Sequence, residues 1–254
     1  MQLYFKQVGE NGTPLVILHG VFGSSDNWLT IGKVLSENHR VFMLDQRNHG
    51  RSPRSEEFNL EVMAEDLKEF LEEHQLHDAV LIGHSMGGKV AMQFAMNYPT
   101  AFDKLIVVDI APRFYPVHHS QILQGLSAIP LATLASRQEA DDILADYESD
   151  PAVRQFLLKN LYRNTDLGHF DWRINLPVIQ KHIAEVGSEL ANRKIIHRPT
   201  LFIRGSESPY ILSEDEKVIH QLFSDVAIVT IQGAGHWVQA DRPNEFVASV
   251  LQFV

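Results

Sequence analysis

A serine flanked by glycines is the residue of this sequence best suited to covalent chemistry. Ser85 is the central residue of a Gly-x-Ser-x-Gly pattern at positions 83–87, which follows an apolar run and opens a helical segment. A serine at a sharp turn between a strand and a helix needs small neighbours, because its backbone lies close to both elements. The N-terminus of such a helix offers unpaired N–H groups to an oxyanion that develops during acyl transfer. The pattern predicts a nucleophilic serine.

The best candidate for the base that activates this serine is His236. A serine hydroxyl is a weak nucleophile unless a base removes its proton. Among the 13 histidines, His236 lies on a glycine-rich segment directly after the apolar run Val226–Ile231. That segment would lie at the carboxyl edge of a parallel sheet, the edge that would also expose Ser85. We expect activity to fall at acidic pH, because a protonated imidazole cannot accept a proton.

Two carboxylates could orient this histidine. The acid must reach the second ring nitrogen, where it holds the tautomer and stabilises the imidazolium. Asp109 follows the apolar run Lys104–Val108, and Glu207 lies on the loop after the run Pro199–Ile203. Either loop would reach the carboxyl edge of the sheet. The residues themselves leave both assignments open.

Short apolar runs alternate with helical segments and would position these side chains. The runs are continuously apolar, which indicates parallel strands covered on both faces. Their alternation with helices predicts a mostly parallel, doubly wound α/β sheet. The predicted strands are Pro14–Leu18, Arg40–Leu44, Ala79–Ile82, Lys104–Val108, Pro199–Ile203 and Val226–Ile231.

The helical segments carry recognisable periodicity and start signals. An apolar stripe predicts a helix over residues 60–71, and another helix is expected from Met86 to Asn97. Ser213 and Glu216 form a capping-box pattern that predicts a helix leading to Phe223. The acidic residues of the first helix are expected on a solvated face: Glu61, Glu65, Asp66, Glu69, Glu72 and Glu73.

Residues 111–195 interrupt the alternation. This stretch has no strong β run, whereas Asp150 and Pro151 predict the start of a helix over residues 152–161. We therefore expect a helical cap inserted between two late strands, and an α/β core formed by residues 1–110 and 196–254.

Composition excludes several classes of protein. With 44% apolar and 21% charged residues the 254-residue chain is typical of a folded globule. A net charge of −10 argues against a nucleic-acid partner or an anionic membrane surface. The absence of cysteine removes disulfides and thiolate chemistry, and no H-E-x-x-H spacing suggests a metal, so no cofactor is expected. Without a signal-peptide pattern or an apolar run of membrane-spanning length, we expect a cytoplasmic protein.

The sequence resembles the α/β-hydrolase superfamily, and more narrowly the bacterial esterase YbfF and its mitochondrial relatives. The narrower signals are residues 47–50 and 109–112. The matching stretches are residues 18–24, 45–52, 83–89, 109–112, 172–177 and 233–237. The resemblance implies the α/β-hydrolase fold with a cap and places the triad acid at Asp109, which we favour over Glu207.

The resemblance also implies an oxyanion hole formed by the backbone N–H groups of Val21 and Met86. Phe22 would then project into the acyl pocket, with His84 and Trp237 nearby. Core packing is the alternative for the two aromatic residues.

Two other charged residues have structural interpretations. We expect Lys89, inside the helix after the nucleophile, to bury its stem and keep its ammonium in solvent. Asp45 is expected to form an ion pair with Arg47, two positions away.

The favoured function is a serine carboxylic-ester hydrolase or thioesterase that uses a Ser-His-Asp triad and an acyl-enzyme. Its substrate would be a small molecule, either a short- to medium-chain acyl ester or an acyl-CoA thioester. Two alternatives remain open: an acyltransferase that uses an alcohol acceptor, and a non-catalytic ligand-binding protein of the same fold.

Overall fold

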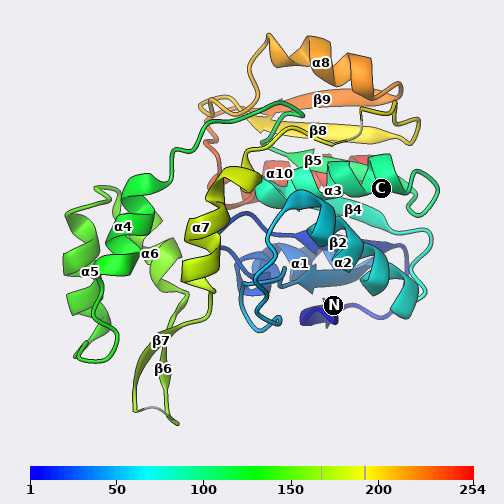
Figure 1. The fold of residues 1–254 in the computed structure, drawn as a ribbon. Helices are drawn as coiled ribbons and strands as arrows, with labels where there is room; N and C mark the ends of the chain where they lie inside the picture. The colour runs from blue at the N-terminus through cyan, green and yellow to red at the C-terminus, as the bar shows by residue number, and fades with distance from the viewer. Residues whose placement is uncertain (167, 192) are drawn as a thin grey trace.

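A seven-stranded sheet forms the centre of the protein in the computed structural model, which describes residues 1–166, 168–191 and 193–254 (Figure 1). The strand order is β1-β3-β2-β4-β5-β8-β9, and only β1 runs antiparallel to its neighbour. The strands are β1 (Phe5–Val8), β2 (Pro14–Leu18), β3 (Arg40–Leu44), β4 (Val80–His84), β5 (Lys104–Val108), β8 (Thr200–Gly205) and β9 (Val226–Ile231).

Every predicted strand is present, because a continuously apolar run fits a strand that is covered on both faces. Alternate residues of β2 belong to different cores: Val16 and Leu18 pack on one face, while Leu15 and Ile17 pack on the other. The edge strand β1 was not predicted, since its half-buried residues lack that apolar signal.

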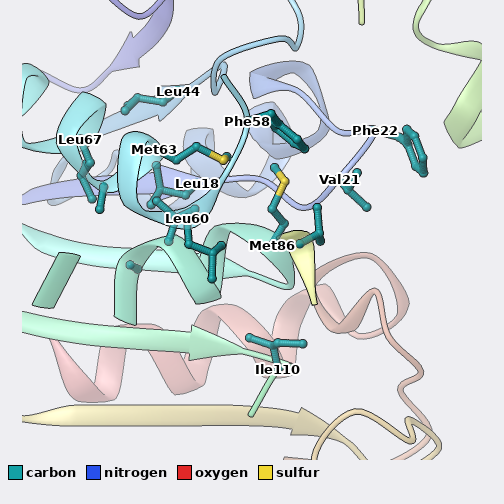
Figure 2. Packing of buried hydrophobic residues seen from close by; sticks show 14 of the residues in the cluster. Leu18, Val21, Phe22, Leu44, Phe58, Leu60, Met63, Leu67, Met86 and Ile110 are labelled. Atoms are coloured by element: carbon teal, nitrogen blue, oxygen red, sulfur yellow. The ribbon is translucent and has the colours of Figure 1, made fainter. Parts of the chain in front are cut away.

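Helices cover both faces of the sheet. Buried residues of α2, α3 and α8 belong to the larger core, part of which is shown in Figure 2, and those of α1 and α10 belong to the smaller one. No helix among the described residues is both long and apolar enough to span a bilayer. The helices outside the segment between β5 and β8 are η1 (Ser25–Trp28), α1 (Leu29–Leu35), α2 (Leu60–Glu73), α3 (Met86–Asn97), α8 (Asp215–Leu222), α9 (Val238–Asp241) and α10 (Pro243–Phe253).

The segment between β5 and β8 lies to one side of the sheet, at the left of Figure 1. It contains a two-stranded antiparallel hairpin as well as helices, which differs from the wholly helical expectation. Each hairpin strand has four residues, too short for a period-two pattern to stand out. Its elements are α4 (Ser120–Ala128), α5 (Arg137–Ala145), α6 (Pro151–Leu158), β6 (Leu161–Asn164), β7 (His169–Trp172) and α7 (Leu176–Val186).

Two helix starts had been predicted from capping signals, with different outcomes. The carboxylate of Asp150 accepts a hydrogen bond from the Ala152 N–H at 2.8 Å, and α6 starts at Pro151 as expected. The capping box at Ser213 does not form. The side chain of Glu216 instead pairs with Arg204 at 2.8 Å, and α8 starts only at Asp215.

A buried ion pair corrects two expectations about charged residues. The guanidinium of Arg47 contacts both carboxylate oxygens of Asp66, with Nε–Oδ2 at 2.6 Å. Asp66 therefore leaves the solvated face of α2, where it had been expected. Asp45 does not pair with Arg47; its carboxylate accepts the backbone N–H groups of Ser25 and Arg51 at 2.6 and 2.8 Å. It joins the loop after β2 to the loop after β3.

Candidate active site

The turn between β4 and α3 presents Ser85 at the carboxyl edge of the sheet. Ser85 has φ 53° and ψ −118°, and its N–H bonds to the Val108 carbonyl at 3.0 Å. A Cβ at Gly83 would lie 2.3 Å from the Gly87 carbonyl oxygen, and one at Gly87 would lie 2.3 Å from that of Leu18. The flanking glycines are therefore required by close backbone contacts. This turn lies at the topological switch point, because β3 and β4 lie on opposite sides of β2.

Ser85 lines a narrow hollow between the sheet and the inserted segment. Ile110 lines it from the loop after β5, and Ile183 and Val186 line it from α7. Aromatic and imidazole side chains complete the wall: Tyr115, His118, His119 and Tyr210. Burial and the neighbouring His118 lower the pKa of His119 to about 3, so this ring is neutral near pH 7. The hollow therefore combines an apolar wall with polar rings.

His236 and Asp109 meet by a direct hydrogen bond. The Nδ1 of His236 lies 2.7 Å from Oδ2 of Asp109, which is fully buried and has φ 51°. Because a carboxylate only accepts, Nδ1 carries the proton and Nε2 is left as an acceptor. Asp109 also accepts the Gly205 N–H at 3.1 Å and the hydroxyl of Ser208. These donors hold the carboxylate beside the imidazole.

Glu207, the other candidate acid, lies away from this contact. Its side chain is exposed, and it has no hydrogen bond or ion pair with any residue that the structure describes. Its backbone N–H bonds to the Ala234 carbonyl at 2.9 Å, which ties the loop but leaves the carboxylate in solvent. The structure brings Asp109, and not Glu207, to His236.

Tyr210 was not among the predicted site residues, yet its ring stacks on His236. The ring centroids are 3.8 Å apart and the planes differ by 16°. Burial and the nearby Asp109 raise the pKa of Tyr210 to about 12, so its hydroxyl stays protonated and donates to Nε2 of His118 at 2.5 Å. Its place on the same loop as Glu207 was a signal that this stretch faces the site.

Two backbone N–H groups near Ser85 have no acceptor among the described residues. Met86 is the first residue of α3, where an N–H has no partner within the helix, and the Val21 N–H makes no hydrogen bond either. The next N–H, that of Phe22, is already donated to Nε2 of His49 at 3.2 Å. The Val21 and Met86 donors are therefore available to a bound ligand.

The three residues expected to line the acyl pocket lie outside the lining of the hollow. Phe22 is 3% exposed and meets His119 edge-on at 5.9 Å; in Figure 2 its ring lies at one end of the cluster, beyond Val21. Trp237 packs on Phe156 at 5.5 Å. His84 is buried behind the site, and its Nε2 donates to the His236 carbonyl at 2.8 Å.

Lys89 is fully buried, which corrects the expectation of a solvated ammonium. Its Nζ donates to the carbonyl oxygens of Arg113 and Ser188, the latter at 2.8 Å. Burial and the charge of Arg113 lower the pKa of Lys89 to about 7. The lysine joins α3 to both connections of the inserted segment.

A family model described as an alpha/beta hydrolase fold matches residues 13–243. The chain belongs to the α/β-hydrolase family. It is 39% identical to the sn-1-specific diacylglycerol lipase ABHD11 of Danio rerio, across 96% of the chain and 79% of that protein. It is 34% identical to the esterase YbfF of Escherichia coli, across 96% of the chain and 94% of that protein.

A solved structure of a marine microorganism esterase is similar over the whole molecule. It superposes with a TM-score of 0.97 at 41% identity, and the match covers 100% of this chain and 99% of that one. The sequence-based resemblance is therefore confirmed, and this α/β hydrolase is of the esterase and lipase type. Among the residues that the structure describes, no group of His, Asp or Glu side chains is arranged to hold a metal ion.

Proposed function

We propose that this α/β hydrolase is a serine esterase that cleaves short- to medium-chain acyl esters through an acyl-enzyme. Ser85 is the nucleophile, His236 the base and Asp109 the acid. The observation that carries the proposal is the 2.7 Å contact between His236 and Asp109, at a hollow that Ser85 lines. The ring of Tyr210 connects the His236–Asp109 pair to the hollow, because it stacks on His236 and lines the same hollow as Ser85.

The first half of the reaction forms the acyl-enzyme. The Ser85 oxygen attacks the acyl carbonyl while Nε2 of His236 takes the hydroxyl proton. The N–H groups of Val21 and Met86 then hold the tetrahedral oxyanion. Losing one such donor typically costs about 3–4 kcal/mol of transition-state stabilisation. When the intermediate collapses, the imidazolium gives its proton to the leaving alcohol.

The second half releases the acid. Water enters the space left by the alcohol, His236 removes its proton, and the resulting hydroxide attacks the acyl carbonyl bound to Ser85. Collapse of this second intermediate returns the proton from His236 to the Ser85 oxygen. Asp109 stays ionised throughout and stabilises the imidazolium in both halves.

The lining of the hollow supports an acyl group of modest length. Ile110, Ile183 and Val186 form an apolar wall beside Ser85, which suits a hydrocarbon chain. Two of the three come from α7, so we take residues 111–195 as a cap that shapes the acyl site. Thioesters fit the same mechanism, because a thiol leaves from the same tetrahedral intermediate.

Acyl transfer to an alcohol is the second candidate. It differs only in the acceptor that attacks the acyl-enzyme, and a relative from Saccharomyces cerevisiae, 34% identical, is named a probable alcohol acetyltransferase. Reactions in water–ethanol mixtures separate the two, since a transferase forms more ethyl ester than the ethanol concentration alone explains.

A fluorophosphonate probe tests the central claim. The wild-type protein should be labelled at Ser85, and folded Ser85→Ala should not be labelled. A series of nitrophenyl esters beside the matching acyl-CoA thioesters then defines the acyl length and the leaving group. Equal labelling of the two proteins, or no labelling of folded wild type, would refute the serine-esterase proposal.

A further inference from the structure

Two hollows, separate from the one at Ser85, lie between the loop after β3 and the β6–β7 hairpin. Both hollows open to solvent. They share the lining residues Gly50, Arg51 and Arg173, so they adjoin. Neither shares a lining residue with the hollow at Ser85. We call the joined space the basic cleft; its unpaired cations are Arg51, Arg54, Lys159 and Arg173.

The lining of the basic cleft carries more positive than negative charge: it contains Lys6, Arg51, Arg54, Lys159 and Arg173 against Asp26, Asp45 and Asp171. Apart from Lys6, none of these cations forms an ion pair with a described residue, although the protein carries a net charge of −10. The carboxylates in the lining have other partners. Asp26 pairs with Lys6, Asp45 accepts the N–H groups of Ser25 and Arg51, and Asp171 accepts from Trp172 and Tyr162.

Arg51 and Arg173 are held in place by tyrosine rings and not by carboxylates. Arg51 lies over the ring of Tyr4 at 5.0 Å and donates to its hydroxyl at 2.7 Å. Arg173 lies over the ring of Tyr162 at 4.6 Å. Stacking fixes the plane of a guanidinium and leaves N–H donors for a ligand, which suits bidentate contacts with phosphate.

A third arginine is held by the backbone of the hairpin. Arg54 donates to the Trp172 carbonyl at 2.7 Å, so the loop after β3 is tied directly to β7. The cleft therefore has cations from both the core and the inserted segment, which a ligand with several negative charges would bridge.

One wall of the basic cleft is shared with the loop that carries Val21. Asn160 is buried in that wall, and its amide donates to the Phe22 carbonyl at 2.7 Å. Ser24 and Ser25, which follow on the same loop, also line the cleft. A ligand in the cleft would thus lie against the outer side of the loop that supplies an N–H to the proposed oxyanion hole.

We propose that the basic cleft binds phosphate groups of a ligand that carries two or more of them, with Arg51 and Arg173 as the main contacts. The phosphates have two possible sources. They belong to a free di- or polyphosphate, or to the leaving group of a phosphorylated acyl substrate. The second source rests on the proposed esterase or thioesterase function, and the first does not.

Calorimetric titration with pyrophosphate tests the binding site itself. Wild type should bind, more weakly as salt is added, and Arg173→Gln and Arg51→Gln should each bind at least about tenfold more weakly. Arg163→Gln is the matched control. It removes the same positive charge as Arg173→Gln, and Arg163 lies on the β6–β7 hairpin but does not line the cleft. Ser85→Ala should bind like wild type, which separates this site from the proposed catalysis.

Either of two results would overturn the proposal: no saturable binding of millimolar pyrophosphate by wild type, or equal weakening in Arg163→Gln and Arg173→Gln. Melting curves identify a variant that has not folded. If Arg173→Gln does not fold, Arg51→Gln alone is compared with wild type.

Kinetics distinguish the two sources of the phosphates. Butyryl-CoA and the butyryl thioester of N-acetylcysteamine contain the same thioester, but only the first carries phosphates. If the phosphates belong to the substrate, Arg173→Gln lowers kcat/KM for butyryl-CoA about tenfold and leaves the short thioester within about twofold. If the phosphates belong to a free ligand, Arg173→Gln leaves kcat/KM for both substrates at the wild-type value, although it still loses pyrophosphate binding.

Discussion

At the scale of single residues, three neighbours fix the position of His236. Asp109 holds Nδ1, the ring of Tyr210 covers one face, and His84 donates to the backbone carbonyl. Ser208 connects two of these neighbours, because its hydroxyl donates to Asp109 and accepts the Tyr210 N–H at 3.2 Å. The position of the proposed base therefore depends on the loop after β8 as well as on its own loop.

Substitution of the two candidate acids separates their roles. Asp109→Asn should lower kcat by about 10⁴, because an amide at that position favours the wrong tautomer of His236. Glu207→Gln should leave kcat within about twofold, since its carboxylate is exposed. Steady-state kinetics with one nitrophenyl ester measure both. The opposite order of effects would move the acid to Glu207.

Tyr210 is expected to act as a positioning residue for His236. Tyr210→Ala removes the stacked ring, and we expect kcat to fall roughly tenfold or more with little change in KM, because the imidazole loses its orientation. Tyr210→Phe keeps the ring, lacks only the hydroxyl that bonds to His118, and should recover most of kcat. A merely structural role would instead appear as equal loss in both variants together with a lower melting temperature.

At the scale of elements, two buried side chains tie α3 to the inserted segment: Gln93 accepts the Ala191 N–H at 2.9 Å, and Lys89 donates to two carbonyls. Lys89→Met would leave the carbonyls of Arg113 and Ser188 without their donor. An unsatisfied buried acceptor costs about 1–3 kcal/mol, partly offset here because a buried charge is also removed. We expect faster amide hydrogen exchange in residues 111–117 and 186–191 and unchanged exchange in β4 and β5. Unchanged exchange in both connections would show that Lys89 does not hold them.

The helix α7 is expected to control acyl length, since Ile183 lines the hollow beside Ser85. Ile183→Ala enlarges the apolar wall and should shift the preferred nitrophenyl ester toward longer chains. Ile143→Ala is the matched control, because Ile143 packs in the same core from α5 but does not line the hollow. The comparison uses kcat/KM across the ester series. An equal shift in both variants would mean that the stability of the inserted segment, and not the wall, sets the preference.

At the scale of the whole molecule, three buried histidines make folding dependent on pH. Burial lowers the pKa of His19 to about 4 and the pKa values of His49 and His84 to about 3, from an ordinary value of 6.5. The neutral rings of His19 and His49 already use both nitrogens: Nε2 accepts the Gln46 and Phe22 N–H groups, and Nδ1 donates to a carbonyl. A further proton on Nε2 would face a donor, so the folded protein resists protonation.

The sign of the pH effect follows from which state binds more protons. Between pH 6.5 and about 4 the unfolded chain is protonated at these histidines and the folded protein is not. Their contribution to stability is present above pH 6.5 and is lost as the pH falls toward the folded values. The free energy of unfolding should drop by up to about 1.4 kcal/mol per pH unit for each histidine. Urea unfolding at about pH 7 and about pH 5 measures it; equal values would contradict these pKa shifts.

The sequence alone was enough for the parallel strands of the sheet, the turn at Ser85 and the family, because these depend on local signals. Continuous apolar runs are typical of strands buried on both faces, and Gly83 is required by its contact with the backbone of nearby Gly87, whereas Gly87 meets the distant Leu18 carbonyl. The same signals located the loop of His236. They could not detect β1 or the β6–β7 hairpin, whose short strands lack a strong apolar pattern.

Tertiary structure alone decided the partners of charged and aromatic side chains. Asp109 contacts His236 across 127 positions, and Arg47 pairs with Asp66 instead of nearby Asp45. Lys89 is buried because two distant carbonyls, from Arg113 and Ser188, meet at its ammonium. A buried charge is tolerated only where partners converge in space, and that convergence depends on how the elements pack. Periodicity along the chain carries no record of it.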